Sequence, residues 1–197
     1  KIDEANVNFI KSKLQDLHIN NSQKWDIGYS VGVLHHVDEL EKVIENISNT
    51  INPKGLFLAN FNIEFPFIRK NTDDALRKKL HQLSEIEQNK FIEEITILSR
   101  VLRTKDKLNV PNLPMIGIKE GEYFVNELIN YFILKMYYNP NLSMKRNVTH
   151  NVDWYKPSIV LGLDTKAVIS LFKEFGLNYL TSFNPTPSSI TICLIND

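Results

Sequence analysis

A strand–helix–strand pattern over residues 25–60 constrains the fold of this chain more than any other feature. Residues 25–34, Trp-Asp-Ile-Gly-Tyr-Ser-Val-Gly-Val-Leu, are mostly apolar, which is typical of a strand buried on both faces of a parallel sheet. One apolar helix face follows, made by Leu40, Val43, Ile44, Ile47 and Ile51. Residues 53–55, Pro-Lys-Gly, then turn the chain into a second apolar run over residues 56–60. The pattern predicts two parallel strands joined by a right-handed crossover helix.

The pattern changes after residue 63. Leucine, phenylalanine and isoleucine recur at helical spacing along residues 64–150, so we expect a helical insertion there. The last part, residues 151–197, predicts a helix capped by Asp164 or Thr165 and ended by Gly176. Two strands follow over residues 177–183 and 189–195, and so short a connection makes them antiparallel. We therefore expect three parts, residues 1–63, 64–150 and 151–197.

Composition excludes several classes of protein. Lys plus Arg and Asp plus Glu both total 23, so the net charge is zero and a nucleic-acid partner is not expected. Cys193 is the single cysteine, which rules out an internal disulfide framework and a multi-cysteine zinc site. No stretch approaches the roughly 18 apolar residues of a membrane span, and no signal-peptide pattern opens the chain. We expect a cytoplasmic protein.

Residues 25–58 resemble class I S-adenosylmethionine-dependent methyltransferases. The family's fourth strand often reads FDLVYSxGVLHHV, and this chain has WDIGYSVGVLHHV at residues 25–37. The family then has a helix, a Pro-Gly-Gly turn and a fifth strand, where this chain has Pro-Lys-Gly at residues 53–55. Residues 6–17 are similar to the third strand and the adenine loop. Residues 152–157, VDWYKP, are similar to a segment that precedes the last helix in some members.

The resemblance implies an α/β, Rossmann-like methyltransferase sheet. By this resemblance the chain contains only part of the family's sheet, strands 3 to 7. This part includes the closing antiparallel hairpin, and a helical insertion interrupts it. The family's glycine loop after its first strand, and the acid that binds the ribose, do not occur in these 197 residues. Strands 1 and 2 lie between strands 3 and 4 in the family's order. We therefore expect the chain to be an N-terminally truncated fragment of a longer protein, inactive when alone.

The resemblance also implies cofactor-binding residues. Ser30, Val31 and Gly32 end the fourth strand, where ligands bind in open α/β sheets. Lys13 and Leu14 align with the family's aspartate and apolar residue at the adenine. A lysine ammonium has only donors and cannot accept a hydrogen bond from the adenine amine, so this substitution departs from the family pattern. The cofactor implied is S-adenosylmethionine.

Three histidines are the catalytic candidates. His35 and His36 follow the fourth strand, and a histidine facing the cleft there could act as a general base near neutral pH. In the family this pair is usually structural or lines the pocket. His150 lies before the last helix. Adjacent histidines rarely point at one ion and a third ligand is not evident, so we expect no metal site.

An aromatic cluster could define the acceptor pocket. Asp153, Trp154 and Tyr155 could bind the substrate, or Trp154 and Tyr155 could simply seal the insertion onto the sheet. The aromatic residues between positions 123 and 138 suit core packing or a homodimer contact, or a cover over an apolar acceptor.

The sequence thus predicts an enzyme that transfers a methyl group from S-adenosylmethionine to a small-molecule acceptor. The alternative is a non-catalytic protein with a degenerate methyltransferase fold that binds or dimerises, which the missing glycine loop and Lys13 favour. A dehydrogenase is a weaker reading, because the antiparallel final hairpin argues against it.

Overall fold

The computed structural model describes residues 9–16 and 24–197 and contains a four-stranded mixed sheet. The strand order is β1-β2-β6-β5, and β1 and β2 are parallel. β6 is antiparallel to both β2 and β5. The strands are β1 (Trp25–Val31), β2 (Ile51–Asn62), β5 (Leu177–Thr186) and β6 (Ser189–Asn196). The predicted parallel pair and closing antiparallel hairpin are confirmed.

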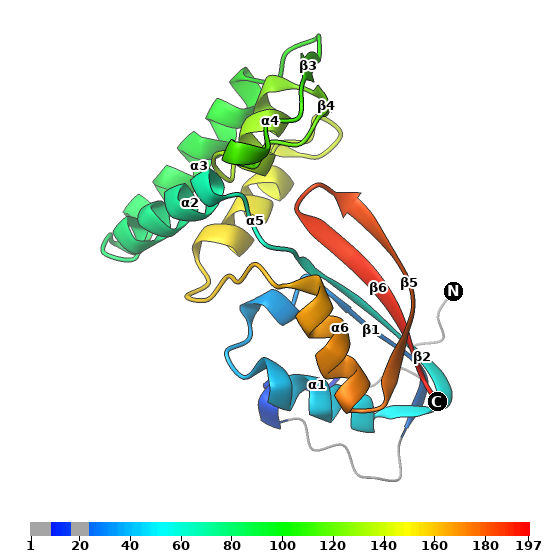
Figure 1. Ribbon diagram of the computed structural model, residues 1–197. Helices are drawn as coiled ribbons and strands as arrows, with labels where there is room; N and C mark the ends of the chain where they lie inside the picture. Colours follow the sequence, from blue (N-terminus) through cyan, green and yellow to red (C-terminus); the bar gives the residue numbers. More distant parts are fainter. Residues whose placement is uncertain (1–8, 17–23) are drawn as a thin grey trace.

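Two helices cover one face of this sheet, as Figure 1 shows: α1 (Leu40–Asn49) and α6 (Thr165–Glu174). Their apolar faces and the inward side chains of β2 and β6 form one buried core, with Val43, Ile44, Phe61, Phe172 and Ile192 at its centre. The opposite face is more exposed along β1, where alternate apolar side chains point away from the helices. In the part of the chain that the structure describes, β1 pairs with β2 alone.

Between β2 and α6 the chain forms a helical block at one end of the sheet (Figure 1). Its helices are α2 (Phe67–Leu80), α3 (Glu85–Val101), α4 (Val125–Phe132) and α5 (Met144–Tyr155). A small hairpin of β3 (Leu108–Val110) and β4 (Gly121–Tyr123) joins α3 to α4. The boundary predicted at residue 150 falls inside α5, so the helical block extends at least to Tyr155.

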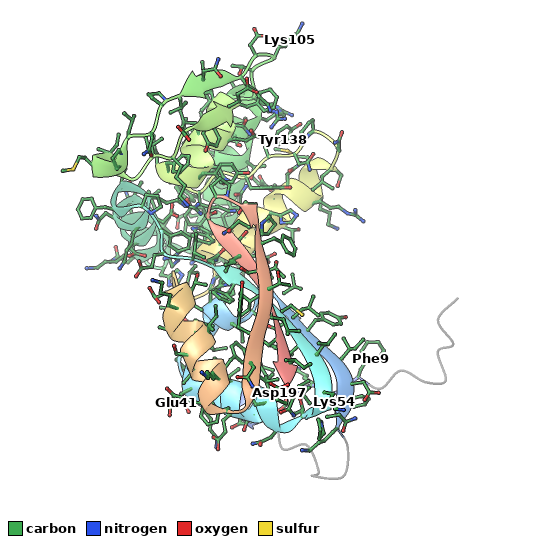
Figure 2. All side chains as sticks on the ribbon, turned by 45° about the vertical axis from the view of Figure 1, so that its right-hand side comes forward. Phe9, Glu41, Lys54, Lys105, Tyr138 and Asp197 are labelled. Carbon is green, nitrogen blue, oxygen red and sulfur yellow. The ribbon has the colours of Figure 1, made fainter. Side chains whose placement is uncertain are left out.

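Some local predictions differ from the structure. Ile51, expected on the helix face, opens β2, because α1 ends at Asn49. The third strand of the family, to which residues 6–17 are similar, lies partly outside the described residues, and Phe9 and Ile10, which are described, carry no strand. The turn predicted at residues 53–55 lies within β2 as a local excursion, because Trp25 pairs with Ile51 while Ile27 pairs with Leu56. Lys54 has a positive φ of 64° there. In Figure 2, Lys54 and Asp197 mark the end of the sheet opposite the helical block, which carries Lys105 and Tyr138.

No helix in residues 9–16 and 24–197 has the length and apolar character needed to cross a membrane.

The final helix ends as its sequence predicts. Asp164 accepts a hydrogen bond from the backbone N–H of Ala167 at 2.7 Å and so caps α6. Gly176 follows the helix with a φ of 90°, a conformation that a residue with a Cβ adopts only with strain. The glycine therefore lets the chain reverse directly from α6 into β5.

Gly176→Ala is expected to lower the free energy of unfolding by about 1–2 kcal/mol, because the left-handed conformation is strained by a Cβ. The added atom itself meets Asn196 Oδ1 at an ordinary 3.6 Å, so strain and not a clash sets the effect. Urea unfolding measures it. Ser170→Ala, at an exposed position of the same helix, is the control and should change the free energy by less than about 0.5 kcal/mol.

Candidate active site

A groove of about 810 Å³ lies where the carboxyl ends of β1 and β2 face the helical block. β1 and β2 contribute Val31, Gly32, Asn60 and neighbouring side chains, while the block contributes Lys135 and others around it. This position is the one at which open α/β sheets bind ligands, and the size suits a small molecule. None of the residues that line the groove is an aspartate or glutamate. The groove therefore carries neutral and basic groups only.

Of the residues predicted to bind a cofactor, Val31 and Gly32 line this groove. Gly32 ends β1 with a φ of 71°, and a Cβ built there meets nothing within 4 Å, so its backbone is open to an approaching molecule. Ser30 points to the other side: it pairs with Ala59, which belongs to the core beneath the helices. Its buried Oγ has no hydrogen-bond partner among the described residues.

The structure does not bring Lys13 and Leu14 to the groove. Leu14 opens a short 3-10 turn, Leu14–Asp16, and packs against the core that α1 helps to form. Asn46 of α1 donates to the backbone carbonyls of Leu14 and Gln15 at 2.9 and 3.0 Å and so fixes the turn to the helix. Lys13 is exposed. A contact of Lys13 and Leu14 with the cofactor stays a prediction.

His35 and His36 lie in a 3-10 turn, Leu34–His36, directly after β1. His36 Nδ1 donates to the carbonyl of Ile159 at 2.8 Å, which ties this turn to the segment before α6. His35 is buried and its Nδ1 accepts from the backbone N–H of Asn62 at 3.4 Å. Burial, with the nearby His36 and Lys135, lowers the pKa of His35 to about 3. So weak a base is poorly suited to take a proton at neutral pH.

His35 is expected to stay neutral in the folded protein well below pH 6, and an NMR titration of its ring protons should show no inflection between pH 5 and 8. Because its folded pKa of about 3 lies below the ordinary 6.5, the unfolded state binds more protons between these values. The stability that neutral His35 supports is full above about pH 6.5 and is lost as the pH falls toward 3. His35→Asn, whose amide oxygen can replace Nδ1, should flatten this acid dependence in urea unfolding. An inflection near pH 6.5 for His35 would contradict the assignment.

The helical block places Lys135 and His150 at the groove. His150 is exposed on α5, with its ring 4.5 Å from that of Tyr137. Lys135 lies after α4, half-buried, and burial lowers the pKa of its ammonium to about 7, with a further contribution from Arg69. The sequence prediction missed Lys135, since it interrupts an aromatic run at residues 131–138 whose pattern indicates packing.

Trp154 and Tyr155, predicted as substrate contacts, are buried inside the helical block, and Asp153 is exposed on α5. The Trp154 indole N–H donates to Asp73 Oδ2 at 3.0 Å, and Arg69 Nε donates to the same oxygen at 3.1 Å. The guanidinium of Arg69 stacks over the Trp154 ring with its carbon 4.8 Å from the ring centroid. These contacts of Trp154 and Tyr155 lie within the helical block, so a substrate contact and a seal of the insertion onto the sheet both stay predictions. A substrate contact by Asp153 stays a prediction.

Asparagines fix the irregular chain between α4 and α5. This segment has no helix or strand to pair its peptide groups, which a buried backbone requires. Asn151 Oδ1 accepts from the N–H of Tyr137 at 2.8 Å, and its Nδ2 donates back to the Tyr137 carbonyl at 3.0 Å. Asn147 pairs with Asn139 in the same way: its Oδ1 accepts from the Asn139 N–H at 2.7 Å, and its Nδ2 donates to the Asn139 carbonyl at 3.0 Å. Asn151 thus fixes Tyr137, which lines the groove, and Asn147 fixes the chain two residues farther along.

Comparison with known proteins supports the reading of the sheet. Residues 1–59 match the family model of the methyltransferase domain. No curated protein matches the chain. PKMT2 from Rickettsia typhi is similar with a TM-score of 0.52 and 15% identity, over 94% of this chain and 38% of that one. The same protein in complex with AdoHcy gives a TM-score of 0.52 and 14% identity, over 93% and 39% of the two chains. An S-adenosylmethionine-dependent methyltransferase from Clostridium acetobutylicum gives 0.39 and 11%, over 93% and 62%.

The chain thus spans about two fifths of the length of the first two solved structures. At these identities the two Rickettsia typhi structures show a shared fold alone, while the family match rests on residues 1–59, which include β1, α1 and most of β2. S-adenosylmethionine is the cofactor of the family. Residues 1–59 thus match the methyltransferase-domain family, and the described sheet and helices share the fold of the solved structure from Rickettsia typhi.

Proposed function

We propose that the protein transfers a methyl group from S-adenosylmethionine to a small-molecule acceptor bound in the groove between the sheet and the helical block. The observation that carries the proposal is the groove itself. It joins the open backbone of Gly32, at the carboxyl end of β1, to polar and aromatic side chains of the helical block. A cofactor at Gly32 and an acceptor beside the block would therefore share one space. The family match supports the cofactor.

The residues present fit S-adenosylmethionine at β1. Gly32 leaves its peptide uncovered, and the groove has room for the cofactor beside it. The apolar side chains of Ile27, Tyr29 and Leu58 suit the flat face of a nucleobase. No acid lines the groove, so the ribose hydroxyls would find amide acceptors such as Asn60.

Methyl transfer requires alignment more than acid–base help. S-adenosylmethionine, when bound, supplies the methyl group: a lone pair of the acceptor forms the new bond to carbon as the carbon–sulfur bond breaks, and those electrons remain on sulfur. The two walls of the groove would hold the acceptor in line with that bond. His150, which is exposed at the groove, would take the proton of an acceptor that carries one.

The test is calorimetric titration of the full protein with AdoHcy, followed by transfer of label from methyl-labelled S-adenosylmethionine. Saturable binding of AdoHcy is expected, and Gly32→Ala should weaken it about tenfold or more, because the added Cβ strains the left-handed backbone and narrows the approach. No saturation at millimolar AdoHcy would overturn the proposal. Binding without transfer to any acceptor would favour the non-catalytic alternative.

The homodimer and the cytoplasmic setting stay predictions. The mass of the protein in solution, from light scattering, decides the first of them.

A further inference from the structure

We propose that the acceptor carries an anionic group, of the carboxylate class, which pairs with the ammonium of Lys135 in the groove. This inference rests on the proposed function and names the chemical class of its acceptor.

Lys135 lies in the groove without a counter-charge. Among the described residues its Nζ makes no ion pair and no hydrogen bond, and no carboxylate lines the groove. Two aromatic rings lie near the ammonium: Nζ is 5.5 Å from the centroid of the Tyr137 ring and 5.3 Å from that of the Trp154 ring. These aromatic faces replace only part of the hydration that the ammonium loses, and neither ring carries a formal negative charge, so an anion in the groove would be held strongly.

The charged groups around Lys135 do not neutralise it. Asp73 and Asp153 favour its charged form, whereas burial and Arg69 disfavour it, and the balance lowers its pKa to about 7. The carboxylate of Asp73 is already occupied, since Oδ2 accepts from Arg69 and Trp154 and Oδ1 accepts from a backbone N–H. His35, which also lines the groove, is neutral, and burial raises the pKa of the Tyr131 hydroxyl above its ordinary value, so that group is uncharged as well.

The helical block holds Lys135 in place from both sides. The backbone N–H of Lys135 donates to Asp73 Oδ1 at 2.8 Å, and its carbonyl accepts from the hydroxyl of Tyr155 at 2.8 Å. Asp73 and Tyr155 are themselves buried and come from α2 and α5. The buried Arg69–Asp73 ion pair and the buried Tyr155 thus fix the backbone of Lys135, whose side chain lines the groove. We assign Asp73 and Tyr155 as positioning residues for Lys135.

Binding of an anion in the groove is expected to be coupled to protonation of Lys135. Near pH 8 most of the Lys135 amine is neutral in the free protein, because its pKa is about 7. A bound carboxylate stabilises the ammonium and raises that pKa, so binding takes up a proton from solution. A neutral acceptor takes up none. A cationic acceptor disfavours the ammonium and releases protons at lower pH.

The experiment compares three probes of one shape: 3-phenylpropanoate, 3-phenylpropanamide and 3-phenylpropylamine. Each is titrated into the full protein, with and without AdoHcy, in two buffers of different ionisation enthalpy at pH 8. We expect the carboxylate to bind about tenfold or more tightly than the amide, since hydrogen bonds to a charged group are the stronger ones. The amine should bind most weakly. Buffer-dependent heat should show proton uptake with the carboxylate only.

Variants of Lys135 and Tyr155 test whether the preference for the carboxylate and the proton uptake arise from Lys135. Lys135→Met should abolish both the preference for the carboxylate and the proton uptake, whereas Lys135→Arg should keep the preference and lose the uptake, because arginine stays charged. Tyr155→Phe removes the hydroxyl that holds the Lys135 carbonyl. It should weaken carboxylate binding several-fold and leave amide binding unchanged, which a loss of packing alone would not do.

Equal binding of the carboxylate and the amide, or an unchanged preference in Lys135→Met, would overturn the anion site. So would absence of carboxylate binding at millimolar concentration. AdoHcy affinity, measured in the same variants, separates the two proposals. A protein that binds the carboxylate through Lys135 but not AdoHcy retains the anion site and loses the methyltransferase proposal. A protein that binds AdoHcy without the carboxylate preference loses the anion site alone.

Discussion

Asp73→Asn is expected to lower the free energy of unfolding by about 3–5 kcal/mol, because it leaves the charge of Arg69 buried without its partner. Both side chains of this ion pair are almost fully buried, with 2% and 3% of their surface exposed. Burial lowers the pKa of Arg69 and the charge of Asp73 opposes that shift, so the carboxylate compensates the buried charge of the guanidinium. An asparagine keeps the shape and some hydrogen bonds but removes the counter-charge.

Urea unfolding followed by tryptophan fluorescence measures this loss, since Trp154 donates to the same carboxylate. Asp74→Asn is the matched control. Asp74 pairs with Arg77 at 2.9 Å but is 55% exposed, so its loss should cost less than about 1 kcal/mol. Equal effects of the two substitutions would mean that the Arg69–Asp73 pair is hydrated and that the block does not depend on it.

The α/β part of this fold could be predicted from the sequence because its signals are local. The apolar run of β1, the helix face of α1 and the glycine after α6 each report an element without reference to the rest of the chain. The antiparallel hairpin followed from the length of one connection. The family's third strand, to which residues 6–17 are similar, could not be tested in the same way, because part of that segment lies outside the described residues.

The helical block was predicted as helical, but its internal order was not. Met136 continues the apolar spacing of Leu128 and Phe132, so the pattern predicts a longer helix than α4, which ends at Phe132. The chain leaves the helix there because asparagine side chains offer its peptide groups other partners: Asn130 Oδ1, for example, accepts from the N–H of Met136 at 3.2 Å. Such pairing depends on tertiary contacts and has no period in the sequence.

The candidate site shows the same division. Val31 and Gly32 were located by the position of a strand end, and the groove contains both. Lys135 was missed, because what distinguishes it is the lack of a carboxylate around its ammonium and the two contacts on its backbone. The two backbone contacts come from Asp73 of α2 and Tyr155 of α5. Both residues are distant from Lys135 in the sequence, so no local pattern indicates the contacts.

Asn151→Leu is expected to destabilise the protein by about 2–4 kcal/mol and to weaken binding in the groove. Leucine has the same number and branching of side-chain heavy atoms as asparagine but cannot pair with Tyr137, whose N–H and carbonyl would both be left without partners. It also cannot donate to the buried hydroxyl of Thr96, which Asn151 Nδ2 reaches at 2.9 Å. Each buried polar group left unpaired costs about 1–3 kcal/mol, and part of that cost is relieved where water can enter from the groove.

The measurement that tests this role combines stability with binding. Asn71→Ala, which removes one hydrogen bond at the exposed surface of α2, serves as the control and should change the free energy of unfolding by less than about 0.5 kcal/mol. In Asn151→Leu, affinity for 3-phenylpropanoate should fall at a temperature where the variant is still folded, because Tyr137 forms part of the groove wall. AdoHcy affinity should stay near that of the unmodified protein, since Gly32 lies on the opposite wall. Loss of both affinities together would instead mean that the helical block and the end of the sheet unfold as one unit.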